Sequence, residues 1–342
     1  MIDGHGDDLW RYGGKVKHNF STNIHSAFDH SPLMAHIASS ADTILSYPEP
    51  EPISVESKIA GLHGCGREEV MVTNGATEAI YMIAKEFSDS NSAIVSPTFR
   101  EYQDACKMHG HEIDFIHSLK EISDKHGLIW LCNPNNPTGR VIPKDAFLEY
   151  IYAYKDKVFV IDQAYSDYTL LPTLTATDAI NAGNVILLGS LTKRFAVPGL
   201  RIGYAIGTKK LLDRVKRWRM PWSVNGIAIE SAKYLIENIG NYDIDAEGLH
   251  KEALRISEEF LRLGIEVESS DCNFILCKLP DGTAAELKQY LMDEGGVLIR
   301  DASNFEGLTE RHFRVAAQRQ EENDELVDLV RRFVQLKLHV PC

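Results

Sequence analysis

The sequence predicts an α/β protein whose central sheet is mainly parallel and flanked by helices, together with a smaller α+β unit. Two observations predict this class. Between residues 70 and 190, short and almost continuously apolar runs alternate with helical patterns, as expected of strands that are covered on both faces. Beyond about residue 208, helical segments and then new strand-like runs follow, which indicates a second unit.

The strands of the larger unit are expected at six apolar runs. These runs are EVMVT (69–73), SAIVS (92–96), GLIWLCN (127–133), KVFVID (157–162), NVILLGS (184–190) and RIGYAIG (201–207). Most successive runs are separated by enough chain for a crossover helix, and this spacing favours parallel pairing.

The rest of the chain predicts the smaller unit and the domain boundaries. Helical patterns are present at 210–220, 225–239 and 322–338, and strand-like runs at 265–279, 296–301 and 312–318. We therefore predict an N-terminal arm at 1–45 that joins the small domain, a large domain at 46–235 and a small α+β domain at 236–342.

Composition excludes several classes of partner. The chain has 342 residues and a formal charge of −13, from 36 basic and 49 acidic side chains. An excess of acid disfavours nucleic acid and anionic membranes as partners. The N-terminus lacks the apolar core of a signal peptide and no apolar run has membrane-spanning length, so we expect a cytoplasmic protein. The six cysteines lack CxxC spacing, so neither a metal site nor a disulfide framework is expected.

Polar residues follow several of the predicted strands, at the edge where a parallel sheet binds its ligands. They are Asn74-Gly75, the segment 133–139, Asp162 and the segment 190–193. Because the carboxyl ends of parallel strands share one edge, these groups are expected to converge on a single site.

The stretch VTNGATEAI (72–80) combines a strand, a glycine turn and a helix start. Free N–H groups at a helix N-terminus bind phosphate, although the same pattern also fits an ordinary capped helix. The hydroxyls and the guanidinium of GSLTKRFAVPGLRIGY (189–204) favour the phosphate interpretation. The candidate phosphate ligands are Gly75, Ala76, Thr77, Ser190, Thr192 and Arg201.

Four further residues suggest chemistry at this edge. Lys193 is expected in a partly desolvated pocket near Arg194 and Arg201, where it would become a competent amine nucleophile, although most lysines are solvated surface residues. Asp162 either pairs with a protonated ring nitrogen or caps the following segment. Tyr165 offers a phenol, and Asn136 offers an amide within NPNNPTG (133–139), which otherwise indicates only a rigid loop.

These motifs resemble the fold-type I pyridoxal-phosphate enzymes of the class I/II aminotransferase group over nearly the full chain. NPNNPTG, VIDQAYSDY and SLTKRFAVPGLRIGY carry the resemblance, with Gln163 where the family commonly has Glu. The resemblance implies pyridoxal 5'-phosphate as cofactor, and it agrees with the amine, carboxylate, phenol and phosphate cradle that this cofactor requires. By the same resemblance, Lys193 forms the internal aldimine and Asp162 pairs with the pyridine nitrogen.

The resemblance also implies roles for the remaining motif residues. Asn136 and Tyr165 are expected to bond the ring oxygen, and Phe99 in SPTFREY is expected to stack on the ring. Tyr47 in LSYPEPE matches a tyrosine that reaches the phosphate of the other subunit. The chain is therefore expected to be a homodimer.

Two subgroups share this short architecture: histidinol-phosphate aminotransferase and the threonine-phosphate decarboxylase of cobalamin synthesis. RMPWSVN (219–225), LIRDASNFEGL (298–308) and HFRVAAQR (312–319) resemble the decarboxylase, as does the early HGDDLW…NFSTNI segment. A small phosphorylated amino substrate is thus expected. Aminotransferase activity with 2-oxoglutarate and glutamate remains the alternative, and a non-catalytic binding module of the same fold is a remote one. The candidate substrate-binding residues are His5, Asn23, Arg300 and Arg314, although the two arginines could instead form surface ion pairs with Asp301 and Glu306.

Overall fold

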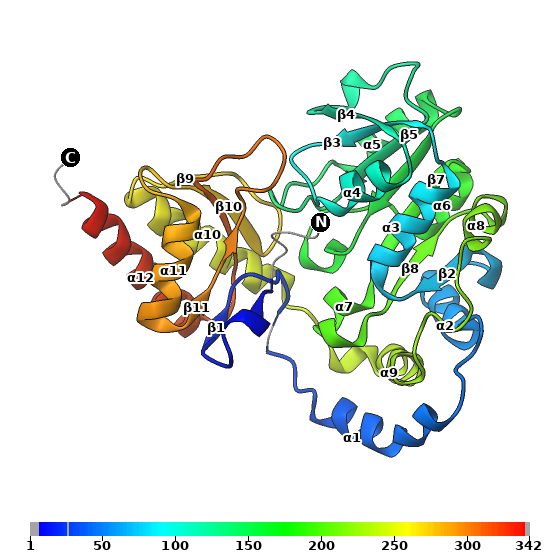
Figure 1. Ribbon diagram of the computed structural model, residues 1–342, viewed down its shortest axis with the longest axis horizontal. Coiled ribbons are helices and arrows are strands. Elements are labelled where there is room, and N and C mark those ends of the chain that lie inside the picture. The colour runs from blue at the N-terminus through cyan, green and yellow to red at the C-terminus, as the bar shows by residue number, and fades with distance from the viewer. Residues whose placement is uncertain (1–6, 26, 339–342) are drawn as a thin grey trace.

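The computed structural model describes residues 7–25 and 27–338 and contains a large seven-stranded sheet and two smaller ones (Figure 1). The strands of the large sheet are β2 (Val70–Thr73), β3 (Asn91–Val95), β4 (Glu112–Ile116), β5 (Leu128–Cys132), β6 (Val158–Asp162), β7 (Val185–Ser190) and β8 (Gly203–Ile206). Their spatial order is β2-β8-β7-β6-β5-β3-β4. β8 alone runs opposite to the other six strands, so the prediction of a mainly parallel sheet is confirmed.

One strand of this sheet escapes the sequence pattern. β4 lies at an edge, next to β3, and its first residue, Glu112, is exposed, whereas the last, Ile116, is buried. An edge strand that is half exposed carries charged residues, and Glu112 and Asp114 therefore hide it from a search for continuous apolar runs.

Helices pack on both faces of the large sheet and against the smaller sheet (Figure 1). They are α1 (Ser31–Ser39), α2 (Ile53–His63), α3 (Gly75–Glu86), α4 (Glu101–Met108), α5 (Lys144–Ala153), α6 (Ala176–Ala182), α7 (Leu191–Arg194), α8 (Lys209–Lys216), α9 (Gly226–Glu237), α10 (Ala246–Arg262), α11 (Ala284–Gly295) and α12 (Gln320–Leu338). The helix expected at 210–220 is shorter and ends at Lys216; Pro221 and Trp222, which has a left-handed φ of 61°, follow in the next connection.

The two faces of the large sheet are buried in separate apolar clusters. Ile129 and Ile161 belong to one cluster, whereas their chain neighbours Trp130 and Val160 belong to the other. Since successive side chains of a strand point to opposite faces, both faces are covered, which explains why the strands are apolar along their whole length.

The smaller unit contains a four-stranded antiparallel sheet in the order β12-β13-β10-β9. Its strands are β9 (Glu266–Val267), β10 (Phe274–Lys278), β12 (Arg300–Asp301) and β13 (His312–Ala316). The strand expected at 296–301 is divided in two. Its first part, β11 (Val297–Leu298), pairs in parallel with β1 (His18–Asn19) of the N-terminal arm, and only β12 joins the sheet.

The first part of the N-terminal arm lies against the smaller unit, whereas α1 packs against α9 of the large unit. Besides the pairing of β1 with β11, the backbone of Phe20 exchanges hydrogen bonds with Leu298 and Ala316, and its side chain is buried in the apolar cluster of that unit. Among the described residues, no helix is both long enough and apolar enough to cross a membrane.

Candidate active site

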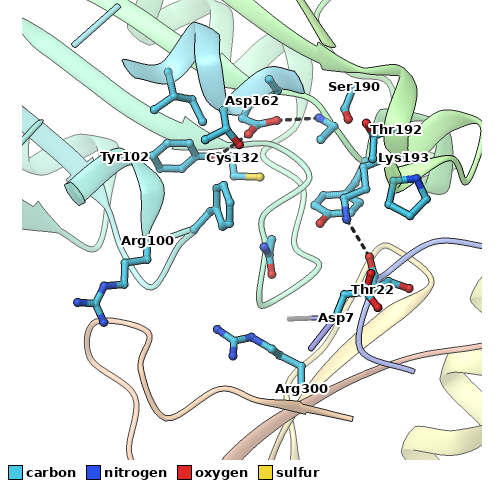
Figure 2. Close-up of a pocket in the computed structure, with 18 of the residues that line it drawn as sticks. Asp7, Thr22, Arg100, Tyr102, Cys132, Asp162, Ser190, Thr192, Lys193 and Arg300 are labelled. Carbon is cyan, nitrogen blue, oxygen red and sulfur yellow. Dashed lines mark hydrogen bonds between the residues drawn. The ribbon is translucent and has the colours of Figure 1, made fainter. Parts of the chain in front are cut away.

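A cavity of about 360 Å³ lies at the carboxyl-terminal edge of the large sheet and extends to the smaller unit (Figure 2). Twelve of the predicted site residues line it. They are Ala76, Thr77, Phe99, Asn136, Asp162, Tyr165, Ser190, Thr192, Lys193, Arg201, Arg300 and Arg314. We call the part formed by α3 and the ends of β5, β6 and β7 the sheet end, and the part formed by Arg300, Arg314 and the N-terminal arm the arginine end.

Tight backbone packing shapes the sheet end near the N-terminus of α3. Gly75 has a φ of 77°, and a Cβ atom added to it would lie 2.5 Å from the Arg201 guanidinium. A Cβ on Gly203 would collide with the backbone nitrogen of Ala76. Gly75 therefore does not line the cavity itself but lets Arg201 approach the first turn of α3, where free N–H groups and a positive charge favour an anion.

Two hydroxyl side chains, of Ser190 and Thr192, complete this region. Ser190 ends β7, and Thr192 lies in the first turn of α7. The Thr192 hydroxyl donates a hydrogen bond to the backbone oxygen of Ile202 at 3.3 Å, so this side chain also ties α7 to the start of β8.

Asp162 ends β6 in a buried position. Its carboxylate accepts hydrogen bonds from the Tyr102 hydroxyl at 2.8 Å and from the backbone N–H of Ala164 at 2.9 Å. Burial raises the pKa of this carboxyl, and the two hydrogen bonds oppose the shift. Within the described chain, Asp162 forms no ion pair, so a cationic ligand group would relieve the cost of burying its charge.

Lys193 projects from α7 toward the N-terminal arm (Figure 2). Its Nζ donates a hydrogen bond to the backbone oxygen of Thr22 at 3.0 Å. Burial lowers the pKa of the Lys193 amine to about 8, and the positive charges of Arg314 and Arg201 add to the effect. About a tenth of this amine is therefore neutral and nucleophilic at pH 7, far more than for a lysine with an ordinary pKa.

Tyr165 and Asn136 lie beside the lysine. The Lys193 Nζ is 5.7 Å from the centroid of the Tyr165 ring, and burial raises the pKa of this phenol, which keeps it protonated and able to donate. Asn136 accepts a hydrogen bond from Arg314 with its Oδ1, so its amide N–H groups remain the donors for a ligand.

An aromatic pair covers the remaining wall. Phe99 lines the cavity, and its ring meets that of Tyr102 edge-on with centroids 5.7 Å apart. Tyr102 is fully buried and stacks on Trp130, which fixes the hydroxyl that Asp162 accepts.

Arg300 and Arg314 face each other across the β12–β13 ladder. Only 8% of Arg300 and 4% of Arg314 is exposed, and burial lowers the pKa of each guanidinium to about 10. Arg300 donates to Asn304 Oδ1 at 2.7 Å, and Arg314 donates to the backbone oxygen of Ser21 and to Asn136.

The arginine end has unusual charge for a buried region. Neither Arg300 nor Arg314 pairs with a carboxylate among residues 7–25 and 27–338, so the alternative of ion pairs with Asp301 and Glu306 does not hold there. The buried Nε of Arg314 also has no hydrogen-bond partner in the described chain. Two adjacent guanidinium groups of this kind fit an anion with two charges, such as a phosphate monoester.

Besides Gly75, two predicted residues of the described chain, Asn23 and Tyr47, do not line the cavity. Asn23 is fully buried behind it, next to Tyr165, with a left-handed φ of 57°. Tyr47 is 85% exposed, and its ring lies 5.3 Å from that of Trp222. His5 lies outside the described residues.

Sequence reasoning missed other lining residues. Tyr102 lies in the same motif as Phe99, SPTFREY, and also lines the cavity. The position of this motif directly after a strand would have indicated that Tyr102 belongs to the site. Thr22 contributes a backbone oxygen, for which a sequence holds no signal. Asp7 lines the cavity because the arm is anchored far along the chain, and Cys132 does so because it ends β5.

The site fits pyridoxal phosphate. The first turn of α3 with Arg201 suits its phosphate, the unpaired carboxylate of Asp162 suits its protonated ring nitrogen, and the lowered pKa of Lys193 suits its aldehyde. Among the described residues, no group of three His, Cys, Asp or Glu side chains could hold a metal ion.

Comparisons with known proteins agree with this fit. The family model for aminotransferase class I and II matches residues 15–330. A protein of Caldanaerobacter subterraneus subsp. tengcongensis, provisionally named threonine-phosphate decarboxylase, is 33% identical over 83% of this chain and 82% of its own. A histidinol-phosphate aminotransferase of Pyrococcus furiosus is 28% identical over 84% and 83% of the two chains.

A solved structure is similar over almost the whole fold. The crystal structure of L-threonine-O-3-phosphate decarboxylase from Porphyromonas gingivalis has a TM-score of 0.90 and 35% identity, and the match covers 93% of this chain and 99% of that one. The chain belongs to the class I and II aminotransferase family, and it is a pyridoxal-phosphate-dependent enzyme.

Proposed function

We propose that this enzyme decarboxylates L-threonine O-3-phosphate to aminopropanol phosphate. The observation that carries the proposal is the pair Arg300 and Arg314, two buried guanidinium groups without a carboxylate partner in the described chain. A phosphate dianion would neutralise both, and it would use donors that are now unpaired, such as the Arg314 Nε. The similarity to proteins named for this decarboxylase supports the same substrate.

The residues around the cavity would have different roles in the reaction. The bound cofactor supplies an electron sink for the bond that breaks at the substrate Cα. Asp162 would hold the ring nitrogen in its protonated form, because its buried carboxylate is most stable next to a positive charge. Lys193 would anchor the cofactor and later carry a proton, because its amine titrates near neutral pH.

The position of the arginines determines which bond is aligned for cleavage. In this enzyme class, the bond that stands perpendicular to the cofactor ring is the one that breaks. If Arg300 and Arg314 hold the phosphate, the substrate carboxylate remains free to take that orientation. An arginine that instead held the carboxylate in the ring plane would protect it, and a proton would be lost in its place.

The deciding experiment compares two substrates with the purified holoenzyme. Threonine phosphate is offered alone, and histidinol phosphate is offered with 2-oxoglutarate, while CO₂, aminopropanol phosphate and glutamate are measured. We expect CO₂ and aminopropanol phosphate in the first reaction and no glutamate in the second. Glutamate without CO₂ would make the enzyme an aminotransferase, the activity named for the Pyrococcus relative.

We also propose that the enzyme is a homodimer in which Tyr47 completes the partner's site. Large apolar side chains are exposed around Tyr47: Ile44 is 73% exposed, Leu45 81% and Met220 69%. A surface of this kind is poorly suited to contact with water. The backbone N–H of Trp222 donates to the Pro50 oxygen, so the two exposed segments form one surface. Sedimentation should give a dimer, and a fully active monomer would contradict the proposal.

A cytoplasmic location is the third part of the proposal. The described cysteines, namely Cys65, Cys106, Cys132, Cys272 and Cys277, are free thiols, and four of them are buried. Free thiols are typical of a reducing compartment. Fractionation of the native organism, followed by immunoblotting, tests the location, and recovery of the protein outside the cytoplasmic fraction would refute it.

A further inference from the structure

The N-terminal arm places a carboxylate, that of Asp7, in the wall of the cavity (Figure 2). The neighbouring Asp8 does not line the cavity but forms an ion pair with Lys288 at 2.8 Å. The two adjacent aspartates therefore have different surroundings. Asp8 anchors the arm to α11, and Asp7 faces the space where a substrate would bind.

A closed set of hydrogen bonds holds Asp7 in this position. The Asp7 backbone N–H donates to Ser21 Oγ at 3.2 Å, the Ser21 N–H donates to Asn19 Oδ1 at 2.9 Å, and Asn19 Nδ2 donates to Asp7 Oδ1 at 2.8 Å. Asp7 also has a left-handed φ of 64°, which few side chains other than Asn and Asp adopt readily. These hydrogen bonds and this backbone conformation suit an aspartate, and together they hold its carboxylate in place.

The neighbouring arm residues Ser21 and Thr22 contact one cationic side chain at each end of the cavity. The backbone oxygen of Ser21 accepts from Arg314, and that of Thr22 accepts from Lys193. The negative charge of Asp7 raises the pKa of Lys193, whereas the acid that acts on Arg300 from the arm is Asp8. The charge of Asp7 therefore acts on Lys193, and the backbone of Asp7 is tied to Ser21, whose neighbour Thr22 contacts the Lys193 amine.

We propose that Asp7 is a specificity-determining residue that repels ligands with a carboxylate next to Lys193. The proposal rests on the function proposed above and extends it. The phosphate of a bound substrate would be held by Arg300 and Arg314, which would offset the repulsion between its carboxylate and Asp7, and loss of CO₂ would relieve that repulsion. Dicarboxylate amino donors such as glutamate, which need a cation for their second carboxylate, would bind poorly for the same reason.

A pair of unreactive ligands isolates this effect. 3-Phosphoglycerate has the same spacing between carboxylate and phosphate as a phosphorylated hydroxy-amino acid, and glycerol 3-phosphate has a neutral alcohol in place of the carboxylate. Neither has an amine, so neither reacts with the cofactor. The measured quantity is the ratio of their dissociation constants for the holoenzyme, determined by titration calorimetry.

We expect Asp7→Asn to tighten 3-phosphoglycerate relative to glycerol 3-phosphate by roughly tenfold, because a like-charge contact disappears. Asparagine keeps the oxygen that Asn19 donates to, so the arm should stay in place. Asp8→Asn is the matched control with the same change of charge, and its ratio should stay within about twofold of the wild type.

Two outcomes would overturn the role of Asp7. They are an unchanged ratio in Asp7→Asn, which includes an equal gain for both ligands, and an equal shift of the ratio in Asp8→Asn. A second measurement uses glutamate alone, which should bleach the visible absorbance of the Asp7→Asn holoenzyme faster than that of the wild type. Because the binding ratio needs no turnover, its failure is distinguishable from a failure of the wild type to release CO₂.

Discussion

The sheet end and the arginine end of the cavity are assembled in different ways. At the sheet end, Asp162, Ser190 and Lys193 come from the ends of the adjacent parallel strands β6 and β7. At the arginine end, Asp7 comes from the arm, and Arg300 and Arg314 come from the smaller sheet, far along the chain from Asp7. The residues of the sheet end follow from one rule, that ligands bind at the carboxyl ends of parallel strands. The residues of the arginine end depend on how segments far apart in the sequence pair.

This difference separates binding of the cofactor from choice of the substrate. The residues that suit pyridoxal phosphate sit on the rigid edge of a sheet that is buried on both faces. The residues that suit the substrate sit on the smaller sheet and on the arm, where a change of one side chain leaves the large sheet untouched. Substitutions at the two ends should therefore give different phenotypes.

The largest effect is expected for Lys193→Ala at the sheet end. Loss of the amine should abolish the visible absorbance of the dialysed protein and reduce turnover at least about 10⁴-fold, the upper range for loss of an acid–base group. Absorbance spectra and CO₂ release measure the two effects. A variant that keeps the wild-type spectrum would show that this lysine does not hold the cofactor.

Asp162→Asn should distinguish cofactor binding from catalysis. The amide keeps the shape of the carboxylate, so some cofactor should remain bound, but it cannot stabilise a protonated ring nitrogen. We expect turnover to fall roughly 10²- to 10³-fold, as when one charge-stabilising group is removed from other active sites. Near-normal turnover at matched cofactor content would contradict the role of Asp162.

A substitution at the arginine end should leave the cofactor in place. Arg300→Gln should raise the KM for threonine phosphate by roughly 10- to 100-fold, the worth of a hydrogen bond to a charged group, with an unchanged absorbance spectrum. Steady-state kinetics and spectra of the same preparation provide the test. Loss of the visible absorbance together with activity would show that the two ends are not separable.

The smallest effect concerns the pH dependence of cofactor loading. Because the pKa of Lys193 is lowered to about 8, the neutral amine accumulates up to that pH and then reaches a plateau. The rate of cofactor uptake by the cofactor-free protein should rise about tenfold from pH 6 to 7 but only about twofold from pH 8 to 9. A lysine with an ordinary pKa would still give a nearly tenfold rise over the second interval, and that result would contradict the shift.

One rule, that ligands bind at the carboxyl ends of parallel strands, predicted that Asn136, Asp162 and Lys193 meet at one edge, and all three line the cavity. The sequence predicted Arg300 and Arg314 only by resemblance, because nothing local shows that β12 and β13 pair and bring these arginines together. Asp7 and the Thr22 oxygen were missed because their positions depend on the pairing of β1 with β11. The edge strand β4 was missed because its charges conceal the apolar pattern.

The pairing of β1 with β11 also has a consequence for the synthesis of the protein. Phe20 can bury its side chain and complete its backbone hydrogen bonds only after Leu298 and Ala316 have been added. At typical elongation rates of 5 to 20 residues per second, this apolar segment waits for about 15 to 60 s after it is made. During that time the ribosome holds a nearly finished chain whose first segment has no partner, so molecular chaperones should bind there.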